Sequence, residues 1–364
     1  MSNHGINLDK TAWNAWINLK KIGSILYHRI RRVVIPLSDV RSVFVGLIDT
    51  EGKKYLSKNK FFADMFNYVL YDGKAVIKPE KLRELDTTEI AIPYGNGARV
   101  PVQKYRDLLR MWSAYMDDTA VYVMLGAELQ GKTHYAMPVK KGLYDMLGYA
   151  RQVDEARSSY KKNPADGDLY VDDDTLKIRL TSEEFLSGFR KGDKLIPIIT
   201  VTVFLSDEKW DGPLDLHEML DVKDKELLRF IPNYPINLVS PANMSDKDFE
   251  KFHTDLGLAM KVYKYLKAGA VEVIEATNHE KIDRDTAVFL NTTAKLGLEF
   301  DEKEEKIDMC KAMEDNNMKK EVTGAIKGMR IMGASDNDII SKIVENFHVA
   351  KEYVLALLAP QKAQ

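Results

Sequence analysis

The sequence predicts an α/β fold with a central mixed β-sheet flanked by helices, followed by an all-helical C-terminal region. Three observations lead to this prediction. Residues 107–116 and 119–129 are two strand-like runs, close enough in sequence to form a hairpin. A long amphipathic pattern begins at Pro138, where proline fits the first turn of a helix. From Ser245 onward the pattern is helical.

Ahead of the hairpin, three short elements are expected. Residues 58–71 carry large apolar side chains at helical spacing, which predicts an amphipathic helix. Residues 78–86 contain a Pro-Glu pair that favours a helix start, and residues 89–93 have the pattern of a short strand. Asp64, on the first helix, is either an accessory residue of a metal site or a solvated acid, and we favour the solvated acid.

Two acids lie at matching ends of the predicted hairpin. Asp107 begins the first run, and Glu128 lies near the end of the second. In an antiparallel hairpin the first residue of one strand lies beside the last residue of the next. A carboxylate buried there must be paired, hydrogen-bonded or bound to a metal, and two converging carboxylates suit Mg²⁺. On spacing alone, ordinary strand-end acids are the more frequent alternative.

The helix after the hairpin is expected over residues 138–162. Its apolar side is expected to include Val139, Leu143 and Leu147. Tyr149 and Gln152 lie further along it, and we assign them no role.

Four shorter segments follow this helix. Residues 163–176 are polar and acidic, which indicates a solvated insertion. Residues 181–189 have the capping pattern of a short helix. Residues 194–205 are the most strand-like segment of the chain, apolar and β-branched enough for a central position. Another short helix is expected over 216–220.

The C-terminal region is expected to contain helices only. The first four are predicted over 245–268, 270–277, 283–296 and 301–333. The pattern of residues 329–358 then resembles a helix-turn-helix, with a capping box that begins at Ser335. Because its charge is mixed, we favour a helical hairpin or an oligomer contact over a DNA-reading element.

Composition limits the class of protein. The chain has 364 residues, of which 45% are hydrophobic and 30% are charged, as in soluble globular proteins. A formal charge of −2 provides no global nucleic-acid signature, so any DNA contact must come from local basic surface. Cys310 is the single cysteine, which excludes an internal disulfide framework and fits a reducing cytoplasm. No apolar run has the length of a membrane span, so we expect a cytoplasmic protein.

The motif order is more specific than any single acid. Asp107, then Glu128-x-Gln130, then HYAMPVKKGLYDMLGYARQV resembles the recombination-promoting nuclease/transposase family. This family is a branch of the PD-(D/E)XK nuclease superfamily in which E-x-Q replaces E-x-K. The likeness covers roughly residues 53–315, in the expected order. Its other stretches are KKYLSKNKFFADMFNYVLYDGK (53–74), ELDTTEIAIPYGNG (84–97), and residues 180–220 and 230–257.

The resemblance implies a restriction-endonuclease-like core and a metal-dependent DNA endonuclease. It implies that Asp107, Glu128 and the backbone carbonyl of Leu129 bind Mg²⁺ or Mn²⁺. Gln130 then stands where the superfamily has a lysine, and its amide can orient water without adding positive charge. This departure leaves the turnover rate open.

Two lysines at the start of the following helix complete the expected site. Lys140 and Lys141 are the candidate DNA contacts. The family has arginine near Lys140, and lysine keeps the charge but loses the bidentate grip on phosphate. A solvated helix surface is an equally good interpretation of both residues.

The resemblance also suggests a division of the chain. Residues 1–52 form a basic N-terminal extension, 53–240 the nuclease-like core, and 241–364 the helical C-terminal region. The basic segment 19–41 is either an arm for DNA or a membrane surface, or an extension outside the enzyme core. We favour the extension, because the likeness begins only near Lys53.

Two rival functions remain beside the endonuclease. The first is a catalytically inactive DNA-binding or protein-interaction module that keeps the nuclease fold. The second is a true DDE transposase, which needs a third carboxylate that the sequence does not reveal. The expected partners are DNA and, through the C-terminal helices, a second copy of the chain.

Overall fold

The computed structural model describes residues 48–91, 102–116, 119–161, 181–222, 224–266, 268–301 and 303–359. The basic segment 19–41 and the predicted insertion 163–176 lie outside these residues. The described residues belong to one unit that starts at Ile48, so the boundaries expected after residues 52 and 240 both fall inside it. Among the described residues, no helix is long and apolar enough to cross a membrane.

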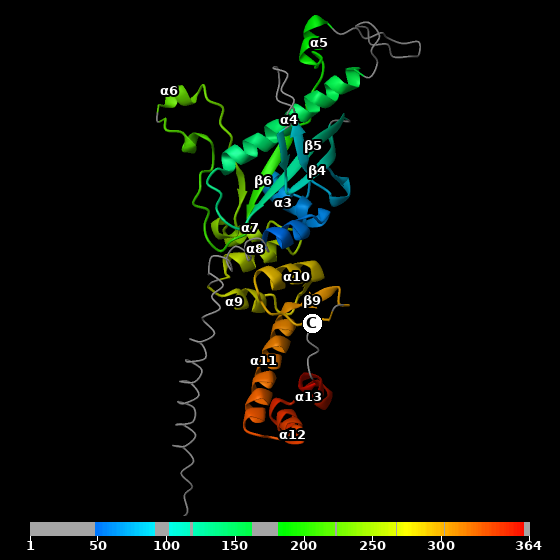
Figure 1. Ribbon diagram of the computed structural model, residues 1–364, viewed down its shortest axis with the longest axis vertical. Helices are drawn as coiled ribbons and strands as arrows, with labels where there is room; N and C mark the ends of the chain where they lie inside the picture. Colours follow the sequence, from blue (N-terminus) through cyan, green and yellow to red (C-terminus); the bar gives the residue numbers. More distant parts are fainter. Residues whose placement is uncertain are drawn as a thin grey trace, which may run out of the picture. The chain divides into compact units, whose positions relative to one another are not determined.

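A five-stranded sheet forms the core of the described chain, and it is mixed, as predicted (Figure 1). Its first three strands pair antiparallel, and the last three pair parallel. Their order is β1 (Leu82–Glu84), β4 (Leu108–Met116), β5 (Thr119–Gln130), β6 (Ile198–Phe204) and β7 (Asn237–Val239). Strands β2 (Thr88–Ala91) and β3 (Val102–Tyr105) form a separate ribbon.

Helices cover both faces of the sheet. On one face, Arg110 of β4 lies over the ring of Phe62 in α3 (Asn59–Tyr71), 5.6 Å from its centroid. On the other face, Met111 packs in a cluster with Tyr149 of α4 (Met137–Lys161). Neighbouring residues of a strand point to opposite faces, so β4 separates the two helices, and Figure 1 shows β4, β5 and β6 between them.

A further helical segment, residues 48–56, packs on the same face as α3. A Cβ atom on Gly52 would lie 2.8 Å from Leu129 and 2.9 Å from Leu205, so this helix approaches the sheet closely at a residue without a side chain. The helix lies against the end of β5 that carries Glu128.

The prediction for residues 78–86 is wrong, and the predicted apolar side of α4 is correct for Leu147 but wrong for Val139 and Leu143. The segment 78–86 forms only a 3₁₀ turn, η1 (Pro79–Lys81), before β1 pairs with the edge of β4. Sheet pairing there overrides the helix start that Pro79 favours. On α4, Val139 and Leu143 are exposed, while Tyr144 and Leu147 are buried. The buried side of α4 also holds a charged network, described below, which apolar periodicity does not reveal.

In its described residues, the C-terminal region is helical except for one two-stranded ribbon. The ribbon pairs β8 (Lys281–Asp283) with β9 (Lys306–Asp308), where the sequence predicts helices only. The helix expected over 245–268 is two separate helices. The helices are α7 (Asp246–Phe249), α8 (Leu256–Lys264), α9 (Ala270–Glu275), α10 (Arg284–Thr293), α11 (Met309–Ile331), α12 (Asp336–Phe347) and α13 (Lys351–Leu358).

The predicted caps are present. Thr181 forms a capping box with Glu184 at α5 (Ser182–Ser187), and Ser335 caps α12 by accepting from the Asp338 amide. Helices α11, α12 and α13 share a small apolar core of their own, centred on Ile339. The elements of the predicted helix-turn-helix therefore form. The strand expected over 194–205 is β6, and the short helix at 216–220 is a 3₁₀ turn, η2 (His217–Met219).

Helix α10 packs directly on the helices of the core. Tyr55 hydrogen-bonds Thr286 at 2.9 Å, and its ring stacks on Phe289 at 4.4 Å between centroids. Lys58 pairs with Asp285 beside them. Helix α10 therefore packs against the 48–56 helix and supports it.

Candidate active site

The β4–β5 hairpin brings the two predicted acids to one end of the sheet. Leu108 pairs with Ala127, so Asp107 precedes the ladder beside Glu128. The carboxylate of Asp107 accepts a hydrogen bond from the Leu129 amide at 2.8 Å, which closes the end of the hairpin. The antiparallel pairing expected from the sequence is therefore the geometry that the structure has.

Glu128 is the most heavily desolvated acid of this site. Its side chain is essentially buried, and Lys140 of α4 lies 2.8 Å from one carboxylate oxygen. The other oxygen, Oε1, is buried and has no hydrogen-bond partner among the described residues. Burial raises the pKa of Glu128 to about 7; the charge of Lys140 opposes this rise, and that of Asp107 adds to it.

Asp107 has a cation of its own. Lys53, from the helix of residues 48–56, lies 2.7 Å from the other oxygen of this carboxylate. The side chain of Asp107 is 14% exposed, so it faces solvent more than Glu128 does. Two lysines thus neutralise two acids at the same strand ends.

Asp49 is a third carboxylate, which the sequence analysis missed. It lies one turn before Lys53 on the same helix, and its Oδ1 atom is buried without a hydrogen-bond partner among the described residues. Burial and the charge of Asp107 raise the pKa of Asp49, while Lys53 and the Gly131 amide lower it. The i, i+4 spacing of Asp49 and Lys53 was the available signal, but it fell in the segment that we assigned to the N-terminal extension.

The side chain of Gln130 hydrogen-bonds the backbone of the preceding residue, Leu129. The side-chain amide of Gln130 donates to the backbone carbonyl of Leu129 at 2.6 Å. That carbonyl is the metal ligand that the resemblance implies. Thr202 of β6 is in register with Glu128, and its hydroxyl is buried with no partner in the described part of the chain. Its polar side chain in an apolar strand was a signal that the sequence analysis did not use.

Lys140 and Lys141 both form ion pairs inside the protein. Lys140 reaches Glu128 across the ring of Tyr144, and its side chain is 25% exposed. Lys141 pairs with Asp145 at 2.9 Å, and its side chain is only 12% exposed. Neither residue is a solvated surface lysine.

A buried charged network supports the loop that carries Asp107. The Arg106 side chain is fully buried and donates to Thr200 at 2.7 Å and to Asp145 at 3.0 Å. Thr200 donates to the same Asp145 oxygen at 2.7 Å. Since Arg106 directly precedes Asp107, this network fixes the backbone from which Asp107 projects.

Asp64 lies away from these acids. Its buried carboxylate accepts from the amides of His253 and Thr254 at 3.0 and 2.9 Å, and from the Thr254 hydroxyl at 2.6 Å. It ties α3 to the segment before α8. Both interpretations offered from the sequence, an accessory metal residue and a solvated acid, are wrong for Asp64.

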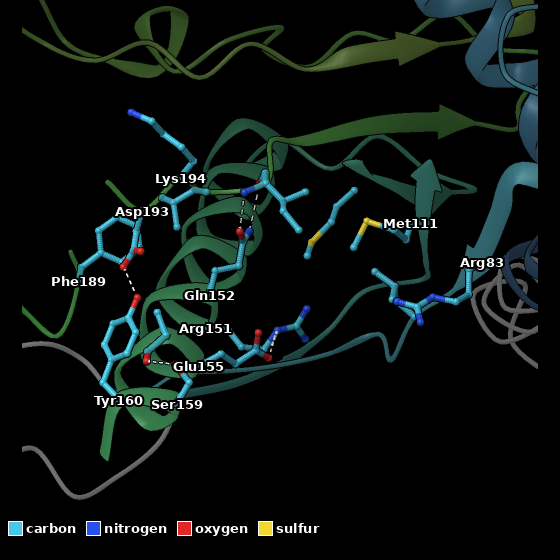
Figure 2. Close-up of a pocket in the computed structure, with 15 residues that line it drawn as sticks. Arg83, Met111, Arg151, Gln152, Glu155, Ser159, Tyr160, Phe189, Asp193 and Lys194 are labelled. Atoms are coloured by element: carbon cyan, nitrogen blue, oxygen red, sulfur yellow. Dashed lines mark hydrogen bonds and ion pairs between the residues drawn. The ribbon is translucent and has the colours of Figure 1, made fainter. Parts of the chain in front are cut away.

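A pocket of about 550 Å³ lies beside the second half of α4 (Figure 2). Gln152 extends to the backbone of Ile196, accepting from its amide at 2.7 Å and donating to its carbonyl at 3.1 Å. Tyr149 accepts from the Ile198 amide at 3.1 Å. Tyr160 donates to Asp193 at 2.5 Å on the pocket wall. Gln152 and Tyr149 thus hold α4 to the start of β6.

No protein-family model, no curated protein and no solved structure matches the chain. The geometry of the site and the quoted motifs are therefore what a functional proposal draws on.

Proposed function

We propose that this chain is a metal-dependent DNA endonuclease with a restriction-endonuclease-like core. Its catalytic centre comprises Asp107, Glu128 and Gln130 on the β4–β5 hairpin, with Asp49 added from the preceding helix. The observation that carries the proposal is Glu128, a buried carboxylate that has Lys140 against one oxygen and no hydrogen-bond partner on the other among the described residues, and that lies beside two further acids. Desolvation of this kind is costly for a structural residue and common at functional sites.

The donor set fits a hard divalent cation. Carboxylate oxygens of Asp49, Asp107 and Glu128, with the carbonyl of Leu129, are the ligands that Mg²⁺ and Mn²⁺ prefer. The Oδ1 atom of Asp49 and the Oε1 atom of Glu128, both buried without a hydrogen-bond partner among the described residues, support this assignment. When bound, the ion supplies an activated water and stabilises charge on the phosphodiester.

The remaining residues of the site bind and orient. Gln130 orients a water through its amide. Lys53 and Lys140 lie against the acids at 2.7 and 2.8 Å, and their ammonium groups would be the phosphate contacts nearest to a bound cation. Lys141 stays within the network of Asp145 and acts on the substrate only through the position of α4.

The wider role follows the resemblance. The resemblance suggests a part in recombination and the spread of mobile DNA, or in defence against phage, and the single cysteine is consistent with a cytoplasmic enzyme. The exposed side chains of Ile331 and Met332 at the end of α11 support an oligomer contact there. Base-specific recognition is weak in this proposal, because the charge of the C-terminal helices is mixed.

Plasmid cleavage tests the proposal. Supercoiled plasmid is incubated with the full chain in Mg²⁺ or Mn²⁺, beside Asp107→Ala, Glu128→Gln and Asp49→Asn. We expect metal-dependent nicking that falls on the order of a hundredfold or more in the Asp107 and Glu128 variants. Glu155→Gln is the matched control, because this acid of α4 is exposed and paired only loosely with Arg151, at 3.8 Å; it should cleave as the wild type does.

Cleavage that ignores metal, or that survives in Asp107→Ala and Glu128→Gln, contradicts the proposal. Absence of cleavage with retained DNA binding in a gel-shift assay identifies the inactive binding module instead.

The DDE transposase remains an alternative, because Asp49 provides the third carboxylate that the sequence did not reveal. A strand-transfer assay with pre-cut DNA ends therefore belongs to the same experiment, and joined products would favour the transposase.

A further inference from the structure

A second group of metal-ligating side chains lies in the helical region, separate from the acids of the sheet. It comprises His279, Asp308 and Cys310, whose ligand atoms all lie within 4.8 Å of one another. In the described part of the chain this is the group in which imidazole, carboxylate and thiol converge.

Two structural features bring these residues together. Pairing of β8 with β9 sets Lys281 opposite Asp308, and His279 lies two residues before Lys281 in a turn with a left-handed backbone, φ 63°. Asp308 caps the N-terminus of α11 through the Lys311 amide, at 3.0 Å, and Cys310 is the second residue of that helix. The ribbon and the helix start therefore converge on one point.

The three side chains differ in what holds them. The Nδ1 atom of His279 lies 2.9 Å from Asp308, and the imidazole side chain is 56% exposed. The thiol of Cys310 is buried, donates to the Ile274 carbonyl at 3.2 Å and lies 3.5 Å from the Thr277 hydroxyl. The group thus presents His279 to solvent and has the thiol of Cys310 at its buried end.

We propose that His279, Asp308 and Cys310 bind Zn²⁺. A thiolate, an imidazole and a carboxylate are a donor set that zinc accepts and that Mg²⁺ does not favour. Three protein ligands leave the fourth tetrahedral position to water. Binding releases the thiol proton to solvent, and the N-terminus of α11 favours the negative charges that Asp308 and Cys310 bring. The bound ion connects the turn at residues 277–280 to the start of α11.

Cobalt titration of the full chain tests this site. The protein is reduced, freed of metal with a chelator and titrated with Co²⁺, whose bond to thiolate produces a charge-transfer absorption. We expect one equivalent of Co²⁺ to produce this band, Zn²⁺ to abolish it by competition, and Cys310→Ser to lack it. His279→Asn should weaken binding about tenfold or more, and because asparagine tolerates the left-handed backbone, it removes a ligand without straining the turn.

The control is His348→Asn. His348 is also exposed and also has a left-handed backbone, φ 53°, but it caps α12 outside the cluster. Its titration should match that of the wild type. Zinc should also raise the melting temperature of the wild type and of His348→Asn by the same amount, and raise that of Cys310→Ser less.

A wild-type titration without the thiolate band overturns the zinc site, as does unchanged affinity in His279→Asn. His279→Asn decides the matter if Cys310→Ser fails to fold. Asp308 is not varied, because it also caps α11. The carboxylates of Asp107 and Glu128 contain no sulfur and produce no such band, so this result is independent of the nuclease proposal.

Discussion

At the scale of single residues, Glu128 shows the conflict between stability and function most directly. Its ionised form is disfavoured by burial and only partly compensated by Lys140, which is why its pKa rises to about 7. A carboxyl group whose pKa is higher in the folded than in the unfolded protein favours folding at low pH. That contribution is lost as the pH rises from about 4.5 through about 7.

Glu128→Gln should therefore stabilise the metal-free protein where Glu128 is ionised. We expect a gain on the order of 2–3 kcal/mol in the free energy of unfolding at pH 8, which shrinks toward zero near pH 4.5. Urea unfolding in the presence of a chelator at the two pH values measures it. An equal effect at both pH values would show that the charge of Glu128 is not its origin.

At the scale of elements, the hairpin depends on a glycine. Gly126 of β5 faces the Arg106 network, and a Cβ atom there would lie 2.9 Å from the guanidinium and 3.1 Å from Thr200. The Arg106 side chain and Thr200 therefore occupy the space that a side chain at position 126 would need. Strand patterns indicate the pairing of β4 with β5, but not this close approach.

Gly126→Ala should disturb the position of Asp107 through Arg106. We expect a loss of about 1–3 kcal/mol in the free energy of unfolding, together with reduced plasmid cleavage at temperatures where the variant is folded. Gly324→Ala is the control. It lies in α11 with open space around it, and alanine should stabilise that helix by up to about 1 kcal/mol. A neutral effect of Gly126→Ala on both measurements would contradict the positioning role of Arg106.

At the scale of the whole molecule, the helical region supports the active site through α10. Phe289 lies between the rings of Tyr55 and Tyr263, with centroids 4.4 and 5.9 Å away. Tyr55 lies on the helix that also carries Asp49 and Lys53. Packing around Phe289 thus fixes the helix that contributes to the proposed metal site.

Phe289→Ala should affect both stability and metal use. We expect a loss of about 3–5 kcal/mol in the free energy of unfolding and a higher Mg²⁺ requirement for cleavage, because the 48–56 helix loses its support. Phe230→Ala is the control, since this side chain is 86% exposed. A different outcome is a Phe289→Ala protein that is destabilised but keeps the wild-type Mg²⁺ requirement while folded. That result would show that α10 contributes to stability and not to metal binding.

Local patterns were sufficient for much of the fold. Alternation and apolar runs predicted β4, β5 and β6, and side-chain caps predicted the starts of α5 and α12, because these features depend on neighbours in the sequence. The convergence of Asp107 and Glu128 also followed from the sequence, since a short connection leaves an antiparallel pair one register that buries its apolar face.

Tertiary packing decided the rest. Asp49 reaches the acids because the 48–56 helix packs on the end of the sheet, whereas Asp64 of α3 binds the backbone of the segment before α8. The β8–β9 ribbon and the cluster at Cys310 depend on pairing between segments that have no strong strand pattern. How deeply an acid is buried, and which cation faces it, depend on contacts distant in sequence; residue type and spacing cannot provide them.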